Sequence, residues 1–276
     1  MMSDPQEPWR LILSPPMTGS ENMALDEALL ETMMQGDAPP TLRLYAWDPP
    51  CLSIGYAQPI EQVDRQAVRR RGWDLVRRPT GGRAILHTDE LTYAVIASDH
   101  GPVFAGGVLP SYRRLSAALA HGLRSLGLDV QVQEAVAGGS AAPADPVCFQ
   151  TPAALEITAG GRKLLGSAQL RRRGGALQHG TLPLRGDLGR ICLGLNYPNG
   201  GGRKLAQQAL RQSAATVEEL RGKPASWDDA AQALLAGFRE CLGAAFLQQN
   251  PSPAERQRAA DLARDRYAYS RWTERI

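Results

Sequence analysis

The sequence predicts an α+β fold, in which a mixed and mainly antiparallel sheet packs with helices. Strand patterns, with alternating apolar and polar residues, dominate residues 41–198. Helical patterns dominate after them, so residues 201–276 are expected to form a helical C-terminal part. The chain has 276 residues, of which 43% are hydrophobic and 21% are charged, which is enough for one sizeable core. We therefore expect a single domain over residues 1–276.

The first part of the chain alternates between helix and strand patterns. A helix is expected over residues 21–35, with Ser20 as its N-cap and Gly36 as its stop. A second helix is expected over residues 59–72 from its apolar periodicity. Strands are expected over residues 41–47, 49–59, 73–79 and 84–98. The last of these ranges is either two strands or one interrupted strand.

The middle of the chain leads from a helix to a loop of small residues. An amphipathic helix is expected over residues 111–127, followed by an alternating strand over residues 128–134. The loop, Ala135–Pro146, consists mainly of alanine, glycine and proline, so we expect it to be mobile. Functional groups often lie on such loops, and Cys148 lies at the far end of this one.

A β-hairpin is expected next, with its turn at Gly160–Gly161. In this register Thr158 lies opposite Lys163, and Glu156 lies opposite Leu165. Alternation then gives one apolar face and one polar face, on which Lys163 is the cation. The polar face is either exposed to solvent, with Lys163 near Glu156, or it is the wall of a polar site.

A glycine pair preceded by arginines lies in the segment RRPTGGRAILH, residues 77–87. Glycine lets the backbone approach a ligand closely, and free N–H groups can cradle an anionic or carbonyl oxygen. Arg77, Arg78 and Arg83 could meet a phosphate or a carboxylate. The alternative is an ordinary turn with solvated arginines. Neither a Walker-type motif nor GxGxxG is present in the sequence.

Cysteine and histidine provide the candidate reactive groups. A cysteine thiolate is a strong nucleophile that forms thioesters, although a lone cysteine is more often a small buried hydrophobe. Cys51, Cys192 and Cys241 fit the buried interpretation, because they lie in apolar patterns, whereas Cys148 follows a loop and precedes a hairpin. His179 is either a general base or a hydrogen-bonded strand residue. The sequence has no CxxC pair, which argues against zinc and a disulfide framework.

Charge and hydropathy argue against several classes of protein. Net charge is only +3 and no nucleic-acid motif is present, so no nucleic-acid partner is expected despite basic clusters. No run approaches the roughly 18 apolar residues of a membrane helix, so no membrane association is expected. The polar first ten residues lack an apolar signal core, which predicts a cytoplasmic protein. The basic clusters are Arg69–Arg71, Arg77–Arg78 and Arg171–Arg173.

Together these segments resemble the biotin/lipoate protein ligase superfamily and, within it, the octanoyltransferases of the LipM type. The resemblance implies a lipoate-ligase-like catalytic domain, in which a mixed sheet and helices surround an acyl-binding tunnel. The matching segments keep the family's order and span nearly the whole chain. They are NMALDEALL (22–30), CLSIGYAQ (51–58), RRPTGGRAILHTDELTYAVI (77–96), CFQTPAALEI (148–157), GRKLLGSAQLRRRGGALQHGT (161–181) and YAYSRWTERI (267–276).

The resemblance also implies an activity and a set of site residues. The activity is transfer of an octanoyl group from octanoyl-acyl carrier protein to a lysine of a lipoyl domain. The acceptor would be the glycine-cleavage H protein or the E2 subunit of a 2-oxoacid dehydrogenase, and the enzyme is expected to be a monomer. Cys148 would carry the acyl group as a thioester, and Lys163 would contact the acyl carbonyl. The implied acyl- and substrate-binding residues are Arg77, Arg78, Thr80, Gly81, Gly82, His87, Gly166, Ser167, Ala168 and His179.

Elementary chemistry agrees with this activity and predicts no cofactor. Exchange between two thioesters is nearly thermoneutral, and lysine attack on a thioester gives a more stable amide, so neither ATP nor a metal is needed. The incoming lysine must lose a proton, because the pKa of a free lysine is about 10.4. A cation at Lys163 would favour the thiolate of Cys148 and help to hold the developing oxyanion.

Two related activities remain open from the sequence. An ATP-dependent lipoate–protein ligase shares the fold but activates free lipoate and needs no cysteine. The cysteine in the CF pair, Cys148, favours the transferase. A lipoyl amidotransferase, which moves the acyl group between two lipoyl domains, is the other alternative. The segment HTDELTYAVI, residues 87–96, is more similar to the enzymes that use the carrier protein.

Overall fold

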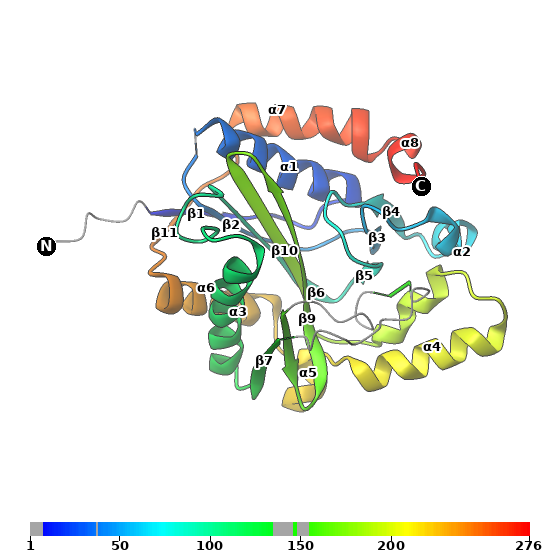
Figure 1. Cartoon of the computed structure of the whole chain (residues 1–276). Coiled ribbons are helices and arrows are strands. Elements are labelled where there is room, and N and C mark those ends of the chain that lie inside the picture. The colour runs from blue at the N-terminus through cyan, green and yellow to red at the C-terminus, as the bar shows by residue number, and fades with distance from the viewer. Residues whose placement is uncertain (1–7, 37, 135–145, 148–154) are drawn as a thin grey trace, which may run out of the picture.

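The computed structural model describes residues 8–36, 38–134, 146–147 and 155–276, whose strands form two sheets (Figure 1). The larger sheet has eight strands in the order β11-β1-β2-β6-β10-β9-β8-β7. Its strands are β1 (Trp9–Leu13), β2 (Thr41–Tyr45), β6 (Glu90–Ala97), β7 (Val130–Glu134), β8 (Leu155–Ala159), β9 (Arg162–Arg172), β10 (Gly175–Pro183) and β11 (Phe246–Gln248).

The pairing confirms the predicted mixed and mainly antiparallel sheet. Strand β1 pairs in parallel with β2 and β11. The other neighbours in the large sheet pair antiparallel. In the smaller sheet the middle strand, β3 (Cys51–Ile54), pairs in parallel with β4 (Asp74–Arg77) and antiparallel with β5 (Ile85–His87). The glycine pair lies in the connection between β4 and β5, where two sheets meet.

Helices cover both faces of the large sheet (Figure 1). Helix α1 (Gly19–Gln35) covers one face and packs against α7 (Pro253–Leu262). Helices α3 (Val108–Ser125) and α6 (Trp227–Leu242) cover the other face and pack against each other. The remaining helical segments are η1 (Ile60–Gln62), α2 (Arg65–Arg70), η3 (Leu188–Gly194), α4 (Gly200–Ser213), α5 (Val217–Arg221), the π-helical η4 (Ala263–Tyr267) and α8 (Ser270–Thr273).

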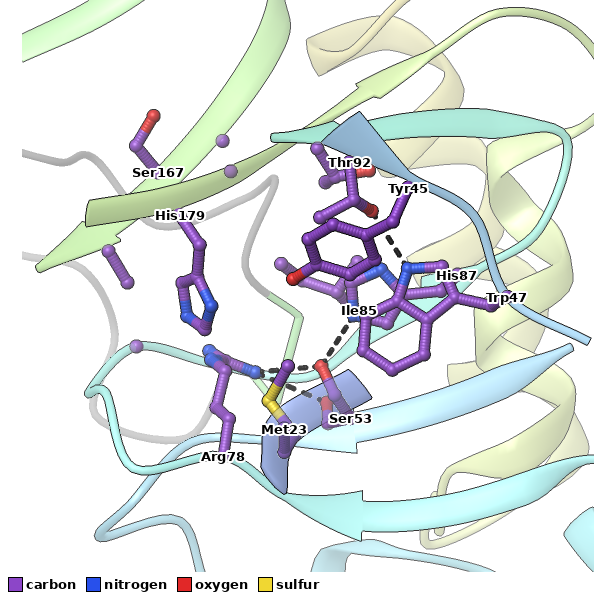
Figure 2. A pocket seen from close by; sticks show the side chains of 15 residues that line it. Met23, Tyr45, Trp47, Ser53, Arg78, Ile85, His87, Thr92, Ser167 and His179 are labelled. Carbon is purple, nitrogen blue, oxygen red and sulfur yellow. Dashed lines mark hydrogen bonds between the residues drawn. The ribbon is translucent and has the colours of Figure 1, made fainter. Parts of the chain in front are cut away.

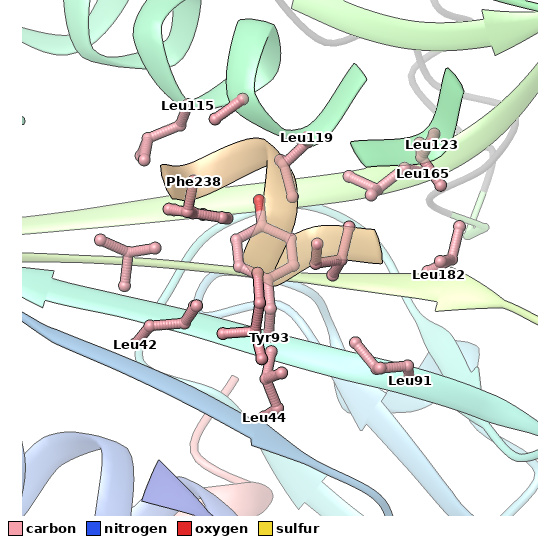
Figure 3. Packing of buried hydrophobic residues seen from close by; sticks show 14 of the residues in the cluster. Leu42, Leu44, Leu91, Tyr93, Leu115, Leu119, Leu123, Leu165, Leu182 and Phe238 are labelled. Atoms are coloured by element: carbon pink, nitrogen blue, oxygen red, sulfur yellow. The ribbon is translucent and has the colours of Figure 1, made fainter. Parts of the chain in front are cut away.

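The central strands supply side chains to a core on each face of the sheet. On β6, Tyr93 and Val95 belong to the core under α3 and α6, which Figure 3 shows. Ala94 and Ile96, which alternate with them, belong to the core under α1. Because both faces are covered, β6 is buried along its whole length. A third core joins the small sheet to η3 and α4.

The predicted hairpin is confirmed at its turn and corrected in its register. Gly160 and Gly161 have φ values of +56° and +74°, as a two-residue turn with two left-handed positions requires. Thr158 pairs with Lys163, as predicted. The register then shifts, so that Ile157 rather than Glu156 lies opposite Leu165. A bulge of this kind inserts one residue into one strand, and residue alternation alone does not reveal it.

The predicted helix boundaries are wrong where a cap or a break decides them. Helix α1 is capped by Thr18 rather than Ser20, because Thr18 and Glu21 exchange the hydrogen bonds of a capping box. The second predicted helix is two segments, η1 and α2. Val63 is extended between them, and the carboxylate of Asp64 accepts the Ala67 N–H and starts α2 anew.

Two strands lie outside the region that the sequence assigned to strands. Strand β1 precedes it, and β11 lies within the part predicted to be helical, where it pairs with β1 in parallel. Both strands are short, and the pairing between them identifies them as strands. The predicted mobile loop, Ala135–Pro146, lies outside the described residues except for Pro146.

Candidate functional site

A buried cavity of about 40 Å³ lies between α1, the small sheet and the centre of the large sheet (Figure 2). Most of its surface is apolar, which suits an alkyl chain better than a charged ligand. Seven of the residues predicted from the sequence line it. They are Arg78, Gly82, His87, Gly166, Ser167, Ala168 and His179.

His87 is hydrogen-bonded at both ring nitrogens. Its Nε2 lies 2.8 Å from Ser53 Oγ and its Nδ1 lies 2.7 Å from Glu90 Oε1, while the Trp47 ring stacks on the imidazole at 4.0 Å. Arg78 donates to Ser53 Oγ at 3.1 Å, which leaves the hydroxyl to donate to His87. This order of donors favours the tautomer in which His87 Nδ1 carries the hydrogen and donates a hydrogen bond to the Glu90 carboxylate.

His179 lies on β10 above a buried ion pair. Its Nε2 is 2.7 Å from Thr80 Oγ1, and its Nδ1 is 3.3 Å from Asp26 Oδ2. Asp26 also accepts from Arg43 at 2.7 Å and from the Tyr45 hydroxyl at 2.8 Å. Burial lowers the pKa of His179, and Asp26 only partly offsets this. Burial would raise the pKa of Asp26, but Arg43 and His179 outweigh it and hold that pKa below its usual value.

The glycine pair packs closely against Gly55 through its backbone and has a hollow on either side. A Cβ on Gly55, at the end of β3, would lie 1.9 Å from the Gly82 carbonyl oxygen, so no larger residue fits there. Gly82 has a φ of +95° and lines the cavity. Gly81 lies on the outer side of the turn and lines a separate surface groove. Arg78 holds the turn by donating to the carbonyl oxygens of Gly81 and Arg83.

Arg77 is placed differently from the prediction, because it does not line the cavity. Its guanidinium is fully buried and donates to the carbonyl oxygens of Thr273, Gly55, Tyr56 and Gln58. These bonds tie β4 to the loop after β3 and to the C-terminal segment. The geometry therefore gives no support to a contact between Arg77 and the substrate.

Lys163 is a buried cation on β9. Its side chain is 5% exposed, and its Nζ lies 2.8 Å from Glu156 Oε1. Its carbonyl oxygen accepts the Ala215 N–H at 3.0 Å, which joins the strand to the segment after α4. The pairing with Glu156 is present as expected, but the polar face is not exposed to solvent at this position.

Cys148 lies outside the described residues, but the residue directly before it is firmly held. Val147 is fully buried and forms a parallel bridge with Ala84, which follows the glycine turn. The Pro146 carbonyl oxygen accepts from the Ala84 N–H at 2.9 Å and from Gln58 Nε2 at 3.0 Å. Pro146 and Val147 are therefore held beside the glycine turn.

Burial was predicted for the other three cysteines, and it is confirmed for two of them. Cys51 and Cys192 are buried, and burial raises the pKa of the Cys51 thiol well above its usual value. Cys241 is exposed on α6, which corrects the prediction for that residue. Within the described ranges, no group of three or more histidine, cysteine, aspartate or glutamate residues could hold a metal ion. None of the helices in those ranges combines the length and apolarity needed to cross a membrane.

Comparison with known proteins places this geometry in a family. The sequence model of the lipoyl protein ligase A/B catalytic domain matches residues 18–239. The chain belongs to the lipoyl protein ligase A/B family. Octanoyltransferase LipM of Kyrpidia tusciae is 40% identical over 271 residues, covering 97% of this chain and 98% of the relative. Octanoyltransferase LipM of Moorella thermoacetica is 40% identical over 275 residues, covering 98% and 99%.

Solved structures confirm the lipoate-ligase fold of this family member. The bipartite lipoate protein ligase of an archaeal lipoylation system from Thermoplasma acidophilum has a TM-score of 0.81 at 26% identity, covering 98% of this chain and 97% of that chain. A lipoate-protein ligase A bound with ATP has a TM-score of 0.80 at 28% identity, covering 97% and 99%. The family resemblance and the fold class predicted from the sequence are both confirmed.

Several residues of the site in this lipoyl ligase family member were not predicted. Ser53, Trp47 and Tyr45 line the cavity, but each reads as an ordinary strand residue, and nothing in its local sequence distinguishes it. Asp26 did leave a signal. Asn22 and Asp26 lie four residues apart in the apolar run NMALDEALL, so one buried helix face had to carry polar groups.

Proposed function

We propose that this chain is an acyltransferase that moves an octanoyl group from octanoyl-acyl carrier protein to a lysine of a lipoyl domain. The observation that carries the proposal is the similarity, over nearly the full length, to proteins named octanoyltransferase LipM. The apolar cavity beside the glycine turn supports it, because an octanoyl chain is an unbranched alkyl chain. The acceptor is the glycine-cleavage H protein or the E2 subunit of a 2-oxoacid dehydrogenase, and the enzyme acts as a monomer.

In the first half-reaction the Cys148 thiolate attacks the thioester carbonyl of the donor. The carrier thiol leaves and takes up a proton, and the octanoyl group stays on Cys148 as a new thioester. The position of Val147 supports this role, because this residue, which precedes Cys148 in the sequence, is buried and pairs with Ala84 just after the glycine turn. No ATP is consumed, because one thioester replaces another.

In the second half-reaction the amine of the acceptor lysine attacks the Cys148 thioester. A carbon–nitrogen bond forms, the carbon–sulfur bond breaks, and the departing thiolate is balanced by the proton that the amine nitrogen loses. Lys163 supplies positive charge near the developing oxyanion in this proposal. Its burial supports the role, because a charge acts more strongly where water is excluded. The Glu156 carboxylate, 2.8 Å away, holds the ammonium group in place.

Transfer of an octanoyl group to a lipoyl domain, detected as a gain in mass, tests this function. The chain is incubated with octanoyl-acyl carrier protein and an unmodified lipoyl domain, without ATP, and the domain is weighed by mass spectrometry. We expect the domain to gain one octanoyl group, and a domain with arginine in place of the target lysine to gain none. Modification only with free octanoate or lipoate and ATP would instead identify a ligase. Modification only from another octanoylated lipoyl domain would identify an amidotransferase.

A further inference from the structure

A second, larger hollow lies on the outer side of the glycine turn. This groove has a volume of about 680 Å³. One wall is formed by the glycine turn and the loop after β3, and the opposite wall by β9 and η4. Gly82 lines both the groove and the buried cavity, so the two hollows adjoin at this residue.

Three arginines give the groove a positive charge. Arg83 lies on the wall of the glycine turn, and Arg172 and Arg266 lie on the opposite wall. Among the described residues that line the groove, none is acidic. The buried carboxylate of Glu27 pairs with Arg172 at 2.6 Å and with Arg266 at 2.7 Å, so one negative charge is shared between two guanidinium groups. Counted over the described residues that line it and Glu27, the groove has a net positive charge.

Aromatic rings pack against two guanidinium groups at the groove, those of Arg266 and Arg275. Arg266 lies 3.8 Å from the centre of the Trp272 ring. Arg275 lies 3.7 Å from the centre of the ring of Tyr56, which lines the groove, and adds a further cation at its edge. Side chains fixed in this way lose little conformational freedom when an anion binds.

The groove also borders the segment that leads to the proposed nucleophile. Gln58, which lines the groove, donates to the Pro146 carbonyl oxygen at 3.0 Å. The N–H of Ala84, next to Arg83, donates to the same oxygen at 2.9 Å. The groove therefore lies beside Pro146 and Val147, which precede Cys148 in the sequence.

We propose that this arginine groove binds the phosphodiester group of the donor's prosthetic arm. The proposal rests on the proposed function, because the arm belongs to the acyl carrier protein. Such a donor has an apolar acyl end, a neutral amide-containing linker and one anionic phosphodiester. An apolar cavity and a basic groove on either side of Gly82 match this order of groups. The planar guanidinium fork also matches two phosphate oxygens at once.

Small donors separate the phosphate from the rest of the carrier protein. Octanoyl-phosphopantetheine and octanoyl-pantetheine differ only in the phosphate, and kcat/KM for octanoylation of a lipoyl domain is measured with each. We expect the wild-type enzyme to prefer the phosphorylated donor. We expect Arg83→Gln and Arg172→Gln each to lower kcat/KM for the phosphorylated donor about 10-fold, as the loss of one charge-assisted hydrogen bond would. We expect kcat/KM for the unphosphorylated donor to stay unchanged in both variants.

The control variant is Arg70→Gln, because Arg70 is exposed on α2 outside the groove and carries the same charge. We expect this substitution to leave kcat/KM unchanged for both donors. Arg172→Gln leaves Glu27 bound to Arg266 and to the Tyr267 hydroxyl, and Arg83→Gln does not disturb that cluster at all. Agreement between the two variants therefore shows an effect of the groove rather than of folding.

Three outcomes would overturn the phosphate assignment. The first is equal use of both small donors by the wild-type enzyme. The second is an equal loss with both donors in the variants. The third is a loss only with intact octanoyl-acyl carrier protein, which would assign the groove to the acidic surface of the carrier instead. Absence of transfer from every donor by the wild-type enzyme would instead contradict the proposed function itself.

Discussion

Asp26 and Arg43 form an ion pair beneath the cavity, with both side chains wholly buried. Replacing Asp26 by asparagine would leave the Arg43 guanidinium buried without its counter-charge. We expect Asp26→Asn to lower the free energy of unfolding by about 3–5 kcal/mol in urea denaturation. The matched control is Asp187→Asn, because Asp187 pairs with Arg211 at the surface, and we expect a change below about 1 kcal/mol there. Equal effects at the two sites would contradict this account.

His179 makes stability depend on pH. Burial lowers its pKa in the folded chain, whereas the pKa of an unfolded histidine is about 6.5. As the pH falls below that value, the unfolded state takes up a proton that the folded state does not. The free energy of unfolding then falls by up to about 1.4 kcal/mol per pH unit, until the pH reaches the folded pKa.

Urea denaturation of His179→Gln at a series of pH values tests this dependence. We expect the variant to lose less stability than the wild-type enzyme between about pH 7 and about pH 5, because the titrating group is gone. His100→Gln serves as the control, since the His100 side chain is 88% exposed. The same pH dependence in His179→Gln and the wild-type enzyme would show that other groups cause it.

Lys163 is the residue whose removal should most affect the reaction without touching the nucleophile. We expect Lys163→Ala to lower the rate of octanoyl transfer about 100-fold or more, as loss of an oxyanion-stabilising group does in other enzymes. Lys204→Ala, at an exposed position on α4, should leave the rate unchanged. Near-normal turnover in a folded Lys163→Ala enzyme would remove this residue from the mechanism.

At the level of residues, the sequence indicated the glycine turn, the two histidines and Lys163 with its partner Glu156, but not the partners of the histidines. Those partners come from distant segments, such as Thr80 for His179, which lies 99 residues away along the chain. Arg77 illustrates the same limit. Its charge suggested a ligand, but its guanidinium binds the carbonyl oxygen of Thr273, 196 residues further on. A local sequence pattern shows that a charged side chain is present but not which groups it binds.

At the scale of elements, hydrophobic periodicity was sufficient for the long strands and helices. It failed for β1 and β11, which pair with each other although most of the chain lies between them. It also failed at Val63, where a single extended residue divides a predicted helix into two. In each case the deciding factor is a backbone hydrogen bond or a cap rather than the apolar pattern.

The packing of α3 against α6 depends on two glycines. A Cβ on Gly237 would lie 2.1 Å from the Ala118 carbonyl oxygen, and one on Gly122 would lie 2.3 Å from that of Ala233. We expect Gly237→Ala to lower the free energy of unfolding by about 2 kcal/mol or more, because the helices must move apart. Gly200→Ala, on α4 with open space around it, should be neutral or slightly stabilising in the same denaturation experiment. Equal stability of the two variants would show that this helix crossing tolerates a methyl group.

At the scale of the whole molecule, the C-terminal segment returns to the glycine turn. Trp272 Nε1 donates to the Arg77 carbonyl oxygen at 2.8 Å, and the Ile276 carbonyl oxygen accepts the Ile60 N–H at 2.7 Å. The end of the described chain therefore supports β4 at its last residue, Arg77, and η1 at its first residue, Ile60. The sequence predicted the helices of this segment but not this return. That all 276 residues form a single domain stays a prediction.

The central claim is that the octanoyl group passes through a thioester on Cys148. The most direct measurement is the intact mass of the enzyme after incubation with octanoyl-acyl carrier protein, without ATP and without an acceptor. We predict a gain of one octanoyl group that hydroxylamine releases, that Cys148→Ala abolishes, and that Cys51→Ala, Cys192→Ala and Cys241→Ala retain. An enzyme that octanoylates a lipoyl domain from this donor but never carries the adduct, or carries it equally in Cys148→Ala, would contradict the claim.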